Sequence, residues 1–193
     1  DNIKYMHADI LQLRGLETEF DIIESVGVLH HMKNPMEGWQ KLTDCLRPKG
    51  LMKIGLYSKL ARQGIIKIRD EIRGSIIEQG DRTMRSLREN LIASERECDK
   101  DIFSSLDAYS ISEFRDLLFH VHEHQFTISE IKYSLAQLRL KFCGFDDQEI
   151  VQKFQTANKG PKDICDLDKW QIYETSNPTT FAGMYVFWCQ KIY

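Results

Sequence analysis

The sequence lacks a charge excess and lacks a long apolar run. Its 26 basic and 29 acidic residues leave a net charge of -3, and charged residues are spread along the chain. This balance gives no electrostatic reason to expect nucleic acid or a membrane surface as partner. With no signal peptide or membrane-spanning segment in the pattern either, we expect a protein of the cytoplasm.

Cysteine is also used sparingly and without a paired spacing. The five cysteines are an odd number and form no C-x-x-C pair; they are Cys45, Cys98, Cys143, Cys165 and Cys189. This excludes the disulfide framework of small secreted proteins and offers no recognisable zinc spacing. We therefore expect free thiols in a reducing compartment.

The chain is long enough for one domain with a real core, since 42% of its 193 residues are hydrophobic. It begins at Asp1 and not at Met, and runs at once into "NIKYMHADI", whose alternating pattern predicts a strand that delivers Asp9 to a loop. We expect a piece of a longer protein.

A strand–helix–strand unit follows. "FDIIESVGVL" is a near-continuous apolar run, typical of a strand buried on both faces of a parallel sheet. Asn34, Pro35 and Glu37 form a helix start, with Asn34 as the cap. "LMKIGLYS" predicts the next strand, which completes a βαβ crossover.

The middle of the chain predicts helices and the end predicts strands. Residues 59 to about 100 read as helical, and Ser110–Glu113 and Thr127–Glu130 each have the spacing of a capping box. "LRLKFCGF" predicts a strand, "DQEIVQKFQTAN" and "DLDKWQIYET" predict helices, and "FAGMYVFWCQKIY" predicts a terminal strand.

The order "ADIL … FDIIESVGVLHHMKNP … LRPKGLMKIGLYS" resembles the second half of class I S-adenosylmethionine-dependent methyltransferases. The resemblance implies cofactor contacts from Asp9 and Ile10 to the adenine, and from the strand end "ESVG" to the methionine part. That strand end comprises Glu24, Ser25, Val26 and Gly27. The whole chain is similar to the methyltransferase portion of bacterial proteins that also carry tetratricopeptide repeats.

The resemblance implies an incomplete Rossmann-like α/β sheet with a helical insertion between its fifth and sixth strands. We expect residues 1–58 to hold strands three to five, residues 59–135 to form the insertion or lid, and residues 136–193 to close the sheet. The family's glycine-rich first motif is missing, and no G-x-G occurs elsewhere. This piece alone is thus expected to bind S-adenosylmethionine weakly or not at all.

Three residues are candidates for catalysis. Ligands of open α/β sheets lie beyond the carboxyl ends of the strands, which is where His30, His31 and Tyr57 fall. Histidine is the side chain most easily poised as a base, and such a base is needed if the methyl acceptor carries a proton. The alternative is a purely structural role, in which one histidine packs beneath the helix and the other is solvated.

The segment "HVHEH" leaves several interpretations open. Extended, it places His120, His122 and His124 on one face, a possible zinc site; helical, it pairs His120 with His124. We favour a polar patch of the substrate pocket, made of His120, His122, Glu123 and His124, because the resemblance places this segment on the substrate side. We assign no metal ligands.

The sequence thus favours a cofactor-dependent methyltransferase with an unknown acceptor, which the resemblance hints is a protein. One alternative is a non-catalytic binding or regulatory module that recognises a protein partner through its helical insertion. An exposed sheet edge would also let the chain pair with its own upstream segment or with itself. The other is a protein that binds a metal through its histidine cluster.

Overall fold

The computed structural model describes residues 2–13, 19–73, 80–96, 99–100, 102–104 and 106–193. Its strands are β1 (Phe20–Val26), β2 (Leu46–Ser58), β3 (Gln125–Phe126), β4 (Leu140–Phe145) and β5 (Tyr185–Lys191). Its α-helices are α1 (Pro35–Cys45), α2 (Gln63–Arg73), α3 (Asp81–Ala93), α5 (Ile111–Phe119), α6 (Ile128–Gln137), α7 (Gln148–Ala157) and α8 (Leu167–Ser176). Its 3₁₀ turns are η1 (Ile10–Gln12), η2 (Leu29–His31), η3 (Ile102–Ser104), η4 (Leu106–Ala108) and η5 (Asp163–Cys165).

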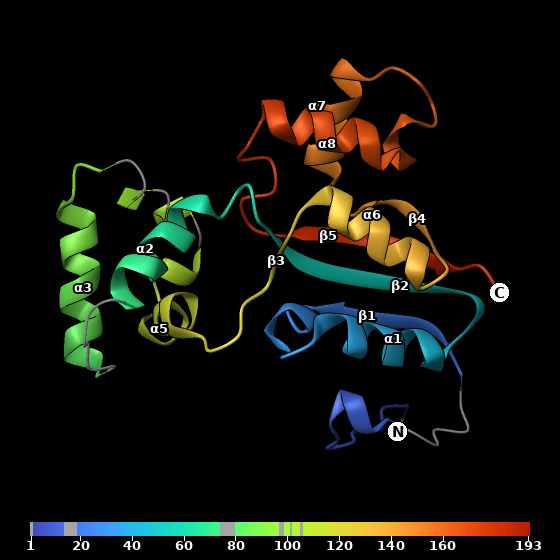
Figure 1. Cartoon of the computed structure of the whole chain (residues 1–193), viewed down its shortest axis with the longest axis horizontal. Helices are drawn as coiled ribbons and strands as arrows, with labels where there is room; N and C mark the ends of the chain where they lie inside the picture. The colour runs from blue at the N-terminus through green and yellow to red at the C-terminus, as the bar shows by residue number, and fades with distance from the viewer. Residues whose placement is uncertain (1, 14–18, 74–79, 97–98, 101, 105) are drawn as a thin grey trace.

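The described residues form a mixed sheet in the order β1-β2-β5-β4 (Figure 1). β1 and β2 are parallel, which confirms the predicted crossover through α1. The prediction that the first of these strands is buried on both faces is wrong: β1 lies at the edge of the described sheet, and Ser25 is its one buried residue. β5, the predicted terminal strand, runs antiparallel to both β2 and β4, and β3 adds a short parallel pair to the end of β2. This α/β arrangement confirms the predicted fold class.

One apolar core joins the sheet to its helices. Its buried members include Trp39 of α1, Ile54 of β2, Ile131 of α6, Trp170 of α8 and Phe187 of β5. Helices of 10 or 11 residues are marginal on their own, so burial against the sheet supplies most of their stability.

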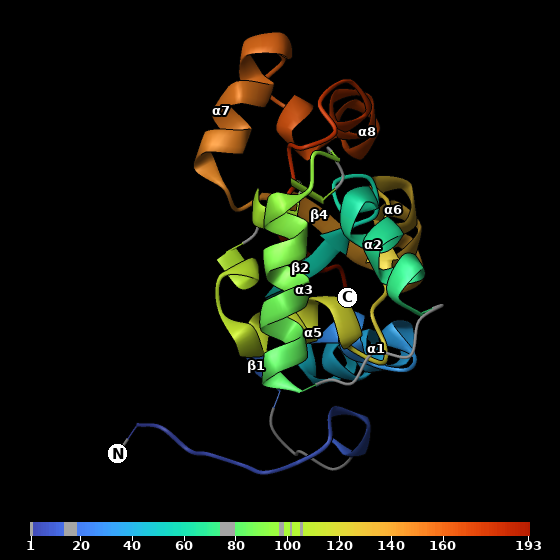
Figure 2. The same cartoon turned by 90° about the vertical axis from the view of Figure 1, so that its left-hand side faces the viewer.

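A second apolar core lies in the helices that follow β2 (Figure 2). Ile65, Ile68 and Ile72 of α2 occupy one helix face and pack in the same cluster as Met84 of α3 and Phe114 of α5. These helices stand beside the sheet and share no buried cluster with it among the described residues.

The prediction of a strand over residues 2–9 is wrong. These residues have no regular secondary structure, are exposed, and lie apart from the sheet below α1 (Figure 1). No described strand is hydrogen-bonded to them, and an isolated strand has neither ladder bonds nor a surface on which Ile3 and Tyr5 can pack. Asp9 instead accepts a hydrogen bond from the backbone of Leu11 and caps η1.

The thiols agree with prediction where they are described. Cys45, Cys143, Cys165 and Cys189 are free, and Cys98 lies outside the described residues. Across the part of the chain that is described, no helix is both long enough and apolar enough to cross a bilayer.

A buried carboxylate joins α8 to the end of β2. Glu174 accepts hydrogen bonds from the hydroxyls of Ser58, at 2.7 Å, and Tyr185, at 2.6 Å. All three side chains are buried, so each depends on the others for hydrogen bonding. This contact fixes the strand end that carries Tyr57.

The two predicted capping boxes differ, and the difference is measurable. Thr127 and Glu130 form a full box at the start of α6, whereas the Ser110 side chain makes no bond to α5, so that prediction is wrong. We expect Thr127→Ala to lower the free energy of unfolding by about 1 kcal/mol. Ser110→Ala, the matched control, changes it by less than about 0.5 kcal/mol. Urea denaturation measures both, and equal losses would contradict the assignment.

Glu174 offers a second test. Glu174→Gln keeps an oxygen that accepts from both hydroxyls, and we expect it to cost about 1 kcal/mol or less. Glu174→Leu leaves two buried hydroxyls without an acceptor and is expected to cost about 2–4 kcal/mol. Thermal and chemical denaturation of the two variants measure the difference in stability. A leucine variant as stable as the glutamine variant would show that the hydrogen bonds to Glu174 do not stabilise the fold.

Candidate active site

The site begins where β1 ends. Ser25 is buried and its hydroxyl has no hydrogen-bond partner among the described residues. Gly27 follows with φ of 76°, in the left-handed region, and a Cβ added there would meet nothing within 4 Å. The chain thus turns sharply into η2 through an open position that glycine occupies without strain.

Four aromatic rings gather just beyond this turn and the end of β2. His30 lies 3.9 Å from Tyr57 and 4.3 Å from His31, and His31 lies 4.0 Å from His120, between ring centroids. The structure therefore brings together all three predicted catalytic residues and one residue of the predicted substrate patch.

The "HVHEH" segment is neither helical nor extended on one face. His120 is the C-cap of α5, and residues 121–124 follow as irregular backbone. Both conformations considered for a metal site are thus wrong. Within the described residues, no group of three or more His, Cys, Asp or Glu side chains is placed to hold a metal ion.

Backbone atoms of this segment bind the histidines that follow β1. The amide of His124 donates to the carbonyl of His30 at 2.8 Å. The carbonyl of His122 lies 3.2 Å from Nδ1 of His31 and 2.7 Å from Nδ1 of His120. The side chain of His122 is exposed, and that of His124 is partly buried.

The segment is held by a buried ion cluster that the sequence did not reveal. The Glu123 carboxylate lies 2.6 Å from the guanidinium of Arg69 and 3.4 Å from that of Arg62, and none of the three side chains is more than 4% exposed. Arg69 also donates to the carbonyls of His120 and Leu117. The one available signal was that Arg69 falls within the apolar stripe of α2.

Arg62 also contacts the aromatic cluster directly. Its guanidinium lies 3.7 Å from the centroid of the Tyr57 ring, a cation–π contact. Tyr57 is thereby fixed by His30 and Arg62, while Ser58, its neighbour, is fixed by Glu174.

The surroundings keep these groups neutral. Burial, with the nearby charges of His31 and Arg62, lowers the pKa of His30 from 6.5 to about 3. Burial also lowers the pKa of His31, and it raises that of Tyr57. At neutral pH both histidines are therefore uncharged and the tyrosine keeps its proton.

The other predicted residues lie around this cluster without joining it. Glu24 is exposed and lies 3.8 Å from the ammonium of Lys53. Val26 is partly exposed at the end of β1. Asp9 and Ile10 lie at η1, which packs against α1.

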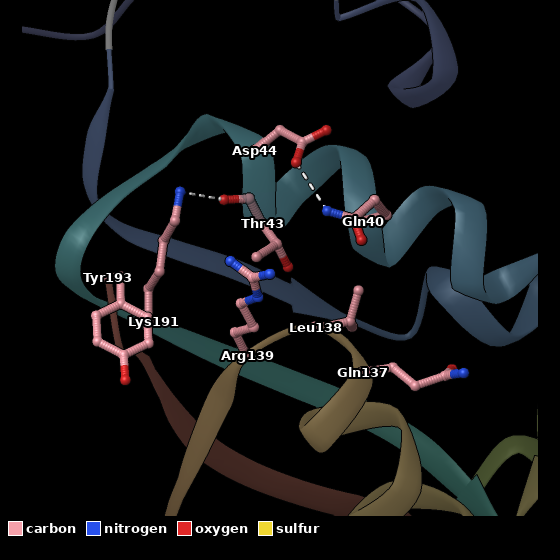
Figure 3. A pocket seen from close by; sticks show the side chains of 8 residues that line it. All are labelled: Gln40, Thr43, Asp44, Gln137, Leu138, Arg139, Lys191 and Tyr193. Carbon is pink, nitrogen blue, oxygen red and sulfur yellow. Dashed lines mark hydrogen bonds between the residues drawn. The ribbon is translucent and has the colours of Figure 1, made fainter.

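A cavity of about 370 Å³ lies at the other end of β2, where α1 and α6 end (Figure 3). Its lining residues are Gln40, Thr43, Asp44, Gln137, Leu138, Arg139, Lys191 and Tyr193. Lys191 donates to the carbonyl of Thr43 at 2.9 Å, and Gln40 donates to Asp44 at 2.8 Å. These hydrogen bonds satisfy polar groups at the C-terminal end of α1. None of the predicted site residues lines the cavity.

Comparison with known proteins supports the assignment of the fold. A family described as "Methyltransferase domain" matches residues 1–54. The structure of PKMT2 from Rickettsia typhi in complex with AdoHcy matches with a TM-score of 0.67 at 13% identity, over 96% of this chain and 38% of that one. A second structure of PKMT2 matches with a TM-score of 0.60 at 14% identity, over 95% of this chain and 37% of that one.

The predicted likeness to class I methyltransferases is confirmed. An uncharacterized protein of Synechococcus, syc1184_c, is 29% identical over 197 residues, which cover 90% of this chain and 44% of the relative. The chain thus spans less than half the length of the relative and of the solved structures that it matches.

The buried histidine makes stability depend on pH. Because the pKa of His30 falls from 6.5 to about 3 on folding, the unfolded chain binds more protons in that interval. Above pH 6.5 the imidazole is neutral in both the folded and the unfolded state, and the free energy of unfolding is at its full value. As the pH falls toward 3, the free energy of unfolding decreases by up to about 1.4 kcal/mol per pH unit. We expect His30→Phe to flatten the plot of unfolding free energy against pH in this range.

The control is His7→Gln, at an exposed histidine outside the ring cluster. The His30→Phe plot is compared with the plot of this variant and with that of the unaltered protein. If the His30→Phe plot is parallel to both, His30 is not held neutral by the fold.

Proposed function

We propose that this chain is the catalytic part of an S-adenosylmethionine-dependent methyltransferase. The observation that carries the proposal is the convergence of His30, His31, Tyr57 and His120 beyond the carboxyl ends of β1 and β2. That position is where open α/β sheets bind their ligands. The likeness to PKMT2, whose structure was solved with AdoHcy, supports the same choice of cofactor.

The residues at the end of β1 fit such a cofactor. The Ser25 hydroxyl is buried without a hydrogen-bond partner among the described residues. The His30 ring is buried beside it, next to the backbone of Gly55. Gly27 leaves open space beside them. We assign Ser25, Val26 and Gly27 to the cofactor's amino acid part, with Glu24 at the rim, and Asp9 and Ile10 to its adenine.

When bound, S-adenosylmethionine supplies a methyl group on a positively charged sulfur. Transfer then requires that an acceptor be held in line with the carbon–sulfur bond. The rings of Tyr57, His31 and His120 would form the wall that orients this acceptor, with His122 and His124 beside it. Glu123 would hold that wall through Arg62 and Arg69, since its own carboxylate is buried.

For the acceptor we propose a protein, and for the compartment the cytoplasm. The proposal of a protein acceptor rests on the resemblance to methyltransferases joined to tetratricopeptide repeats. The proposal of the cytoplasm rests on the free thiols. An exposed apolar row on β1 favours the alternative of a binding module; its members are Phe20, Ile22 and Val26.

Calorimetry with S-adenosylhomocysteine tests the proposal. It is titrated into the 193-residue chain and into a form lengthened by any sequence that precedes Asp1 in the gene. We expect binding by the lengthened form and affinity at least about 100-fold lower, or none, for the shorter one, a difference of about 2.7 kcal/mol or more.

Two glycine variants sharpen the test. Gly27→Ala strains a residue with φ of 76° at the site, and we expect it to weaken binding by about 10-fold or more. Gly144→Ala imposes comparable strain in β4, where φ is 129°, and should leave the affinity unchanged. Failure of both chain forms to bind would refute the proposal and favour the binding module.

A further inference from the structure

Two histidine rings of the site share a single hydrogen-bond acceptor. Nδ1 of His31 and Nδ1 of His120 both point at the carbonyl oxygen of His122, at 3.2 and 2.7 Å. A carbonyl oxygen accepts hydrogen bonds and cannot donate them, so each Nδ1 must carry the hydrogen. The backbone thus selects one tautomer of both rings.

The choice of tautomer decides which nitrogen is available for chemistry. A neutral imidazole with hydrogen on Nδ1 has its lone pair on Nε2. His30 is fully buried and cannot meet an acceptor without a change in the fold, whereas His31 is only partly buried. Of the two histidines that follow β1, His31 is therefore the one whose Nε2 can take a proton from outside.

The groups around His31 keep that nitrogen free. Burial lowers the pKa of His31, and charges on His120 and Arg62 act in the same direction. The carbonyl of His122 and the carboxylate of Glu123 oppose them. His30 and Tyr57, the other titratable neighbours, contact the ring at 4.3 and 5.8 Å between centroids.

We propose that the His122 carbonyl holds His31 as the Nδ1–H tautomer, so that Nε2 of His31 is the proton acceptor of the site. His120, held in the same way, is the second such ring. This assignment rests on the proposed methyl transfer and narrows the acceptor to a nitrogen, oxygen or sulfur that bears a proton. It excludes acceptors that have no proton to lose, such as thioethers.

The proposed step balances as follows. The acceptor's lone pair forms the bond to the methyl carbon, and the electrons of the broken carbon–sulfur bond stay on sulfur. The proton of the acceptor passes to Nε2 of His31, which becomes a cation. The His122 carbonyl stabilises that cation, because it accepts the Nδ1–H hydrogen bond in both protonation states.

Long-range proton–nitrogen NMR of the ¹⁵N-labelled lengthened protein tests the tautomer directly. At pH 7.5 we expect hydrogen on Nδ1 and none on Nε2 of His31, and hydrogen on Nδ1 of His120. His31→Asn and His120→Asn assign the two sets of signals. An Nε2–H tautomer of His31, or a doubly protonated ring at this pH, would overturn the proposal.

His122→Ala is the matched control, because the accepting group is its backbone carbonyl. The variant should keep both tautomers, and their loss would show that the histidine side chain and not the carbonyl sets them. Diethyl pyrocarbonate, which acylates unprotonated imidazole nitrogen, gives an independent reading by peptide mass spectrometry. We expect modification of His31 before His30, and the reverse order would contradict the assignment.

Calorimetry with S-adenosylhomocysteine on the same samples separates the two proposals. If the cofactor product binds but His31 is the Nε2–H tautomer, only the base assignment fails. If it does not bind, the proposed function fails and the role of His31 as base fails with it.

Discussion

The site depends on one buried carboxylate. Glu123 lies between the guanidinium groups of Arg69 and Arg62, away from water. Removing such charges from water is costly, and the attraction offsets this only when the remaining hydrogen bonds are made. Arg69 meets that condition by binding two backbone carbonyls, and Gln125 donates to Glu123 as well. The geometry of residues 120–125 follows from this arrangement.

A buried ion cluster of this kind specifies a position more than it adds stability. Here it sets where the His122 carbonyl lies, and with it the orientation of two imidazole rings. The short pairing of Gln125 with Tyr57 continues the same constraint into the sheet. A side chain in the helical region thus sets the geometry of the ring cluster at the end of a strand.

The sequence predicted the regular parts of the fold well because their signals are local. The apolar run of β1, the Asn34 cap and Pro35 of α1, and the β-rich terminal strand each need only a few neighbouring residues. The strand expected over residues 2–9 failed because its alternation has meaning only beside another strand. Pattern alone does not supply that partner.

The site was predicted in part for the same reason. His30, His31 and Tyr57 lie at strand ends, and topology brings strand ends together. Arg62 and Arg69 were missed, because a charged residue that is buried by a distant carboxylate has no signature in its own neighbourhood. The conformation of "HVHEH" is set by those arginines, so it could not be predicted from the sequence either.

The two separate apolar cores have a consequence for motion. One core belongs to the sheet and the other to α2, α3 and α5. We expect regions with separate cores to open with different free energies. The sheet region carries His30, His31 and Tyr57, while the helical region carries Arg69 and His120. The aromatic cluster therefore forms only while the two regions are in contact. Amide hydrogen-exchange rates of residues 120–125 would report how often that contact is lost.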